Sequence, residues 1–190
     1  MEFARKELIT QLVESQFNDS IKVITGIRRS GKSYLLFTLY KNYLIKYQKV
    51  KPSNIIAIDL EFPKNKQYED PLVLYNYIES QIKNKKEKYF VFIDEIQTDM
   101  VKNKEDKNDG KVKFHNLLNG LLHFKNADVY VTGSNSRLLS KDVVTEFRGR
   151  GKQIHVYPLS YIESAEQFKN KSKEVLLDEY MIFGGLPGVW

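Results

Sequence analysis

The chain has 190 residues, of which 42% are hydrophobic and 28% are charged, with 30 Lys and Arg against 24 Asp and Glu. These values exclude wholesale disorder and fit one compact unit with a C-terminal extension. No apolar stretch approaches the roughly 20 residues that span a bilayer, and the charged N-terminus lacks the apolar core of a secretory signal, so we expect a cytoplasmic protein without a membrane role. The lack of cysteine excludes disulfides, thiolate zinc sites and a cysteine nucleophile.

Runs rich in β-branched and aromatic residues alternate with stretches of helical periodicity along most of the chain. The expected strands are residues 21–25, 54–59, 89–94, 128–132 and 153–157. The expected helices are residues 3–17, 32–47, 71–82, 112–124, 160–168 and 173–183. Because near-continuous apolar strands that alternate with helices form parallel sheets covered on both faces, the sequence predicts an α/β three-layer sandwich.

The alternation of strands and helices stops after Tyr157. We therefore expect residues 1–158 to form the core and residues 159–190 to form a short helical extension, the start of a further domain. The almost wholly polar segment 101–110 is predicted to be a surface loop.

A phosphate-binding loop is predicted between the first strand and the helix that follows it. The residues fit G-x-x-x-x-G-K-[ST] at every fixed position and read Gly26-Ile27-Arg28-Arg29-Ser30-Gly31-Lys32-Ser33. The glycines let consecutive backbone N–H groups surround the β- and γ-phosphates of a nucleotide, while Lys32 adds a cation and Ser33 can ligate Mg²⁺. We expect this phosphate loop, together with the adjoining Tyr34, to bind ATP and Mg²⁺.

Two consecutive acids, Asp94 and Glu95, end the third predicted strand. Asp94 is placed to hold Mg²⁺, and Glu95 is placed to orient and polarise the water that attacks the γ-phosphate. An aspartate alone would fit a nucleotide kinase or a slow switch. The Asp-Glu pair favours hydrolysis by water.

Polar and basic residues follow the fourth predicted strand. Asn135, or Ser134 beside it, is expected to contact the γ-phosphate or the attacking water, because ligands of open α/β sheets bind at the carboxyl ends of the strands. Arg148 and Arg150 precede the last strand, and either could reach a neighbour's γ-phosphate in a homo-oligomer. In a monomer, they would bind the same nucleotide or lie on the surface.

The net charge of +6 raises the possibility of DNA binding. The lysines lie mainly in mixed runs, which are typical of solvated surface. Five of the six arginines lie in the phosphate loop or between residues 137 and 150. The informative positive charge therefore points first to the phosphates of a nucleotide and only secondarily to DNA.

The motifs, taken in chain order, resemble those of AAA-type P-loop ATPases of bacteria and archaea, in which an ATPase core precedes a C-terminal domain of poorly assigned function. The matching segments are residues 25–33, Ile93-Asp94-Glu95-Ile96-Gln97, Thr132-Gly133-Ser134-Asn135-Ser136, Arg148-Gly149-Arg150 with Tyr157-Pro158-Leu159-Ser160, and Tyr180 with Gly184-Gly185-Leu186-Pro187. The resemblance implies a five-stranded parallel sheet of order 5-1-4-3-2, and it implies the roles given above for Lys32, Ser33, Asp94 and Glu95. Nothing in the chain matches the family's C-terminal domain, and segment 101–110 resembles an insertion.

The leading hypothesis is a Mg²⁺-dependent ATPase in which Lys32, Glu95, Asn135, Arg148 and Arg150 serve catalysis and Ser33 and Asp94 hold the metal. The alternative is a slow nucleotide-controlled switch or DNA-associated loader whose output is partner binding. A nucleotide kinase is a third hypothesis. The three histidines are too dispersed for an obvious zinc site.

Overall fold

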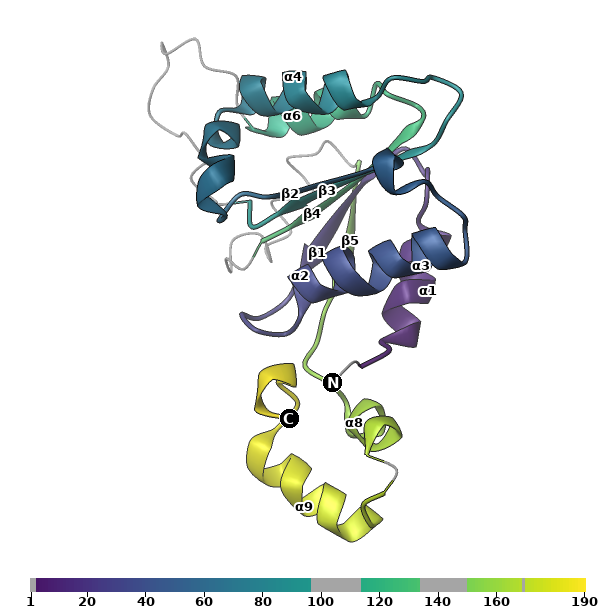
Figure 1. The fold of residues 1–190 in the computed structure, drawn as a ribbon. Coiled ribbons are helices and arrows are strands. Elements are labelled where there is room, and N and C mark those ends of the chain that lie inside the picture. The colour runs from purple at the N-terminus through teal and green to yellow at the C-terminus, as the bar shows by residue number, and fades with distance from the viewer. Residues whose placement is uncertain (1–2, 97–113, 134–149, 169) are drawn as a thin grey trace.

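Five parallel strands form one sheet in the computed structural model, which describes residues 3–96, 114–133, 150–168 and 170–190 (Figure 1). The strands are β1 (Ile21–Thr25), β2 (Ile55–Asp59), β3 (Tyr89–Asp94), β4 (Ala127–Thr132) and β5 (Gly151–His155). Their spatial order, β2-β3-β4-β1-β5, is the predicted order, with β4 between β1 and β3. The α/β prediction and the strand order are therefore confirmed.

Helices cover both faces of the sheet, as Figure 1 shows. On one face α4 (Pro71–Gln81) and α6 (Phe114–Leu121) pack on alternate residues of the strands, among them Val23 and Val91. On the other face, α1 (Lys6–Glu14) and the helix after β1 cover Ile24, Phe92 and their neighbours. Because successive side chains of a strand point to opposite faces, the nearly continuous apolar strands supply both cores.

The helix after β1 is continuous but is not regular. It consists of α2 (Lys32–Tyr34), the π-helical segment η1 (Leu35–Tyr40) and α3 (Lys41–Lys46). The predicted helix 32–47 is confirmed in extent, but not as a uniform α-helix. Segments of π-helix are uncommon and often lie at functional sites.

Several predicted boundaries differ from those observed; for example, the first helix ends at Glu14 and not at residue 17, and α6 ends at Leu121 and not at residue 124. Two of the differences have a clear physical reason. The first helix begins at Lys6 and not at residue 3, because Arg5 has left-handed backbone angles (φ 46°) that a right-handed helix excludes. The last strand occupies Gly151–His155 and not residues 153–157, because its pairing with β1 ends where Thr25 lies opposite His155. Polar residues at the start of β5 concealed the beginning of this edge strand.

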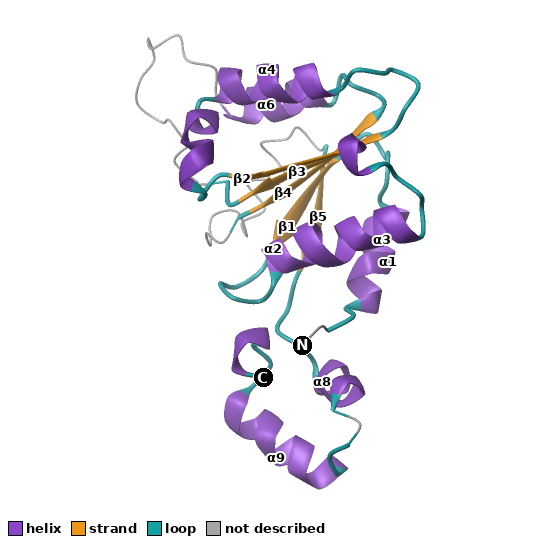
Figure 2. Cartoon of the chain, viewed as in Figure 1, coloured by secondary structure: helices purple, strands orange, loops and turns teal. Residues whose placement is uncertain are grey.

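Two further helices, α8 (Tyr161–Gln167) and α9 (Lys173–Phe183), follow β5, and the 3-10 turn η4 (Pro187–Val189) comes last. Figure 2 shows them beyond the end of the sheet from which the loop between β1 and α2 emerges. Arg5 joins α8 to the core, since its guanidinium donates to Glu163 Oε2 (3.2 Å) and to the carbonyl oxygen of Tyr157. The division at residue 158 stays a prediction. Within the described ranges, no helix combines the length and apolar character needed to cross a membrane.

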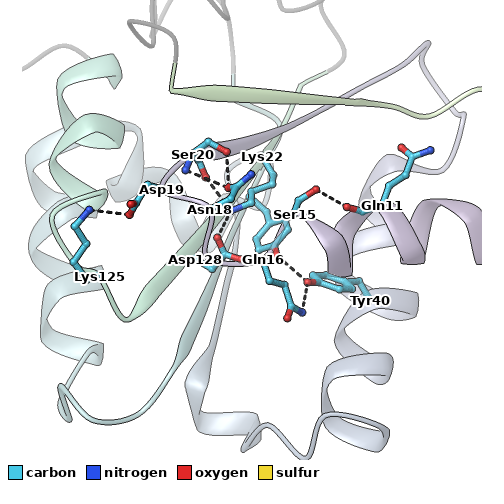
Figure 3. Close-up of polar contacts among 11 residues, drawn as sticks. Gln11, Ser15, Gln16, Asn18, Asp19, Ser20, Lys22, Tyr40, Lys125 and Asp128 are labelled. Carbon is cyan, nitrogen blue, oxygen red and sulfur yellow. Dashed lines mark hydrogen bonds and ion pairs between the residues drawn. The ribbon is translucent and has the colours of Figure 1, made fainter.

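A buried ion pair joins β1 to β4. The ammonium group of Lys22, 0% exposed, donates to Asp128 Oδ1, and Asp128 is 2% exposed. Figure 3 shows this pair and, beside it, the hydrogen bond of 2.8 Å between Gln16 and Tyr40. Tyr130 links the two parts, because its hydroxyl donates to Asp128 Oδ2 (2.7 Å) and lies 2.8 Å from the hydroxyl of Tyr40. Burial lowers the pKa of Lys22, and Asp128 opposes this effect.

Replacing Asp128 with Ala is expected to reduce the free energy of unfolding by about 3–5 kcal/mol, because Lys22 then stays buried without its counter-charge. The double variant Lys22→Met, Asp128→Leu removes both charges and is expected to lose much less stability. Denaturant unfolding measures both variants. Equal destabilisation of the single and double variants would contradict this account of the pair.

Candidate functional site

The phosphate loop leaves β1 at Gly26, where only glycine fits. Gly26 has φ 151°, and a Cβ atom there would overlap the carbonyl oxygen of Val156 and lie 2.9 Å from Ser30 Oγ. The chain just after β5 is itself held on β1 by a hydrogen bond from Val156 N–H to the carbonyl of Thr25 (2.7 Å). The loop therefore lies directly against the segment that leads out of the sheet.

Gly31 ends the loop and begins the helix. Its φ of 95° is one that glycine adopts without steric cost, and its carbonyl accepts the first helical hydrogen bond from Leu35 N–H (2.8 Å). The N–H groups of the first helical turn have no acceptor within a helix, so they can bind an anion. Ser30 adds a buried hydroxyl whose Oγ has no hydrogen-bond partner among the described residues.

Lys32 is 4% exposed and folds back over the loop. Its Nζ donates to the carbonyl oxygens of Gly26 (3.2 Å) and Ile27 (3.1 Å). Burial lowers the pKa of Lys32, while the nearby carboxylates of Glu95 and Asp94 raise it. The structure thus brings the predicted cation and the two predicted acids into one site. Ile27, Arg28 and Arg29 are exposed on the outer part of the loop, and Tyr34 is exposed on α2.

Asp94 and Glu95 are held on β4 by one residue, Thr132. The Thr132 hydroxyl donates to Asp94 Oδ1 and accepts a hydrogen bond from the backbone N–H of Glu95 (3.0 Å). The Thr132 carbonyl also accepts from Ile96 N–H (2.9 Å). Glu95 has φ 54°, a left-handed conformation that non-glycine residues seldom adopt and that occurs often at functional sites.

The carboxyl group of Asp94 is buried, at 4% exposure, and burial raises its pKa. The charges of Glu95 and Asp59 act in the same direction, while hydrogen bonds from Thr132 and Ser33 oppose them. A buried carboxylate surrounded by like charge favours a cation nearby.

The side chains present fit Mg²⁺ bound together with phosphates. Mg²⁺ is usually held in such sites by one or two protein oxygens, water and substrate phosphates. Ser33 lies near enough to Asp94 to lower the pKa of its carboxyl group, and the two side chains could supply those oxygens. In the part of the chain that the structure describes, no group of three or more His, Asp and Glu side chains forms a self-contained metal site.

Arg150 lies at the amino ends of the strands, opposite the end of the sheet that carries the phosphate loop. Its carbonyl oxygen accepts from Ile21 N–H (2.8 Å) at the start of β1, whereas the phosphate loop follows the end of β1. Its side chain lines a depression of about 450 Å³ together with Asn116 and His123. The geometry does not bring Arg150 to the loop of its own chain, and contact through a neighbouring copy stays a prediction. Asn135, Ser134 and Arg148, like segment 101–110, lie outside the described residues.

A cavity of about 650 Å³ lies next to the site. Its walls come from the start of α1, from α8, and from His155 and Tyr157, which flank Val156. Val156, which lies between His155 and Tyr157 in the chain, packs on Gly26 at the beginning of the phosphate loop. The volume of the cavity is in the range of small-molecule sites.

Several residues of the site were not assigned a role from sequence. The sequence predicts Thr132 only as the last residue of a strand and Val156 only as part of one. Pro187 belongs to a motif that supported the family resemblance, yet it lies near Gly31, because a Cβ there would be 3.8 Å from Pro187 Cγ. The motif Gly184-Gly185-Leu186-Pro187 can be recognised in the sequence, but its position beside the phosphate loop cannot.

The glycine loop after β1, the lysine at the head of the helix and the sheet order define a P-loop α/β fold. A model of the family described as AAA domain matches residues 18–165. The chain belongs to this family.

The chain is also similar in sequence to two relatives and in fold to a solved structure. The chain is 34% identical over 98% of its length to an uncharacterized protein of Haemophilus influenzae, and 32% identical over its whole length to one of Methanocaldococcus jannaschii. It spans 44% and 41% of the lengths of these relatives. The fold is similar to that of Saccharomyces cerevisiae Hsp104 in a complex with casein, with a TM-score of 0.60 and 16% identity over 97% of this chain and 35% of that chain.

Replacing Asp94 with Asn is expected to raise the free energy of unfolding at neutral pH in metal-free buffer, because the variant removes a buried charge but keeps the side chain's shape. The folded protein binds the Asp94 proton more tightly than the unfolded chain does, since the pKa is raised on folding. The destabilisation caused by ionised Asp94 is thus fully present when the pH lies above the raised pKa of the folded state. It disappears as the pH falls below the ordinary pKa of an aspartate in the unfolded chain. The two proteins should therefore become equally stable in acid.

Denaturant unfolding at neutral and acid pH measures this difference. The matched control is Asp178→Asn at an exposed position of α9, which is expected to change stability by less than about 0.5 kcal/mol. An Asp94→Asn protein no more stable than wild type at neutral pH would show that the buried carboxylate carries no penalty.

Proposed function

We propose that the chain binds ATP together with Mg²⁺ and hydrolyses the β–γ phosphoanhydride bond. The observation that carries this proposal is the meeting of Lys32, Asp94 and Glu95 at the carboxyl edge of the sheet, next to a loop built for phosphate. In parallel α/β sheets this edge is where ligands bind.

The binding roles follow from the donors present. The N–H groups at the start of the helix and the ammonium of Lys32 would hold the phosphates, for which Lys32 would exchange its bonds to the carbonyls of Gly26 and Ile27. Ser33 and Asp94 would hold Mg²⁺, which when bound would offset the negative charge of the phosphates. Thr132 would keep Asp94 in position for this task.

Glu95 is the proposed base. Its carboxylate would orient a water molecule in line with the γ-phosphate and take its proton as the water oxygen bonds to phosphorus and the bond to the ADP oxygen breaks. The hydrogen bond from its backbone N–H to the Thr132 hydroxyl holds the backbone from which this side chain extends. The strained backbone at Glu95 agrees with a residue held for function and not for packing.

The adjoining cavity supports a nucleotide as the ligand in preference to phosphate alone. Its volume of about 650 Å³ can take a base and ribose beside the loop. Tyr157, exposed in the wall of this cavity, offers an aromatic surface for the base.

An arginine from a neighbouring copy would complete the site in a homo-oligomer. Arg150 at the far edge of the sheet, or Arg148 before it, would then act in trans. The alternative function, a slow switch or DNA-associated loader, uses the same nucleotide site. ATP turnover with and without DNA, combined with sizing in the presence of nucleotide, separates a simple ATPase from these alternatives.

Replacing Lys32 with Ala is expected to weaken ATP binding about 10- to 100-fold, the effect of losing a hydrogen bond to a charged group. Calorimetric titration with ATP measures the affinity, and tripolyphosphate tests whether the nucleoside contributes. The matched control is Lys46→Ala at an exposed position of the same helix. Unchanged ATP affinity in a folded Lys32→Ala protein would overturn the proposal.

Replacing Glu95 with Gln is expected to leave ATP affinity within about twofold of wild type and to reduce turnover about 10²- to 10⁴-fold, the usual contribution of a general base. Phosphate release under saturating ATP and Mg²⁺ measures turnover. Glu61→Gln, at an exposed position just after β2, is the matched control. Normal turnover by the Glu95→Gln protein would remove Glu95 from the mechanism.

A further inference from the structure

Five segments enter the strands at the amino end of the sheet, opposite the phosphate loop (Figure 1). Four of them run from the end of a helix to the start of a strand, and the fifth leads into β5. Their described parts are residues 15–20, 47–54, 82–88, 122–126 and 150. Side chains join segments that are distant in the sequence, since Asn126 Nδ2 donates to the carbonyl oxygens of Asn84 (3.3 Å) and Glu87 (2.9 Å). The segments therefore form one surface, which we call the basic end.

The excess positive charge of the chain is concentrated on the basic end. Eight exposed Lys and Arg lie there against two acids, a net charge of +6, and the eight are Lys49, Lys51, Lys83, Lys85, Lys86, Lys88, Lys125 and Arg150. Since the whole chain also has a net charge of +6, all its other residues together are balanced. Each acid is paired with one lysine, Glu87 with Lys51 (2.7 Å) and Asp19 with Lys125 (2.8 Å; Figure 3). Within the described segments, six cations thus form no ion pair.

Stabilisation of helix ends does not account for this charge. Basic residues favour the last turn of a helix because its carbonyl groups carry partial negative charge, and the effect fades beyond that turn. The last turns of α1, α4 and α6 contain no basic residue, and that of α3 contains Lys46, which is not among the eight. The four helix ends together contribute about −2 charges, so the basic end stays strongly positive.

The charge and polarity of the basic end fit a nucleic acid better than a membrane. Helices that bind membrane surfaces have an apolar face beside their cations. Of the large hydrophobic side chains that are exposed in the described residues, only Tyr47 lies on the basic end. Strands lie about 4.8 Å apart, so the five strands span about 19 Å. Duplex DNA has about 11 phosphates over that length, and the six cations match the half of them that face one side.

We propose that the basic end binds the phosphate backbone of duplex DNA without reading its sequence. Lysine ammonium groups are compact charges that neutralise phosphates, and contacts to phosphate carry no direct sequence information. The phosphate loop lies at the other end of the sheet. The inference therefore does not depend on ATP binding or hydrolysis.

The test measures binding of the chain, without nucleotide, to a fluorescein-labelled DNA duplex of about two helical turns. Fluorescence anisotropy at several salt concentrations is expected to give a slope of about −5 for log K against log salt, since six phosphates are neutralised. Two duplexes of unrelated sequence should bind with affinities within about threefold of each other. Absence of binding, or a slope near zero, would overturn the proposal. Binding to phosphatidylserine vesicles but not to DNA would assign the basic end to a membrane and would overturn it equally.

Variants locate the binding surface. The triple variant Lys83→Gln, Lys85→Gln, Lys86→Gln is expected to weaken DNA binding at least about tenfold at low salt and to make the slope shallower by about 3. The matched control, Lys64→Gln, Lys66→Gln, Lys173→Gln, removes the same charge at exposed positions outside the basic end and should keep the slope within about 1. Equal losses in the two triple variants would assign binding to the net charge of the chain and refute a DNA site at the basic end.

Discussion

The close approach of Gly26 to the carbonyl oxygen of Val156 is the constraint on which the site depends. Because no side chain fits between them, the beginning of the phosphate loop lies directly against the chain that leaves β5. The loop then runs from Gly26 to Gly31, where the helix begins. The carbonyls of Gly26 and Ile27 then lie where Lys32 can bond to them. Strand order adds the acids, since β4 brings Thr132 between the loop strand and Asp94. Local backbone geometry and sheet topology are thus both needed to bring Lys32 and the two acids into one site.

Two buried carboxylates in this fold serve opposite ends of the sheet and differ in their partners. Asp128 has a full counter-charge in Lys22 and a donor in Tyr130, so its role is to join β1 and β4. Asp94 has hydroxyl groups beside it, from Thr132 and Ser33, and lies near two further acids, Glu95 and Asp59. The nearby positive charge is that of Lys32, which these acids share. A structural site satisfies its charges internally, whereas a binding site leaves part of that task to the ligand.

The strands, their alternation with helices and the phosphate loop could be predicted because their signals are local, such as the apolar run before Asp94 and the spacing from Gly26 to Ser33. The strand order came from family resemblance. From sequence, Lys22 is only a polar residue in a predicted strand, because its burial depends on Asp128, which lies 106 positions away. The places of Thr132 against Glu95 and of Pro187 against Gly31 likewise depend on contacts between distant segments. The limits of β5 were misplaced because Val156 and Tyr157 have strong strand propensity, although the chain has already left the sheet there.

β5 is an edge strand, and among the five described strands it buries the fewest residues. Lys152 and Gln153 make this edge polar, which discourages pairing with a strand of another molecule. The same polarity makes β5 the strand whose local opening costs least, because few apolar contacts are lost when it leaves β1. Such an opening would carry Val156 and Leu159 away together, and Leu159 N–H donates to the carbonyl of Gly185 (2.6 Å). The phosphate loop and residues 184–190 would therefore be released in one subglobal step while α4, α6 and the strands beneath them stay folded.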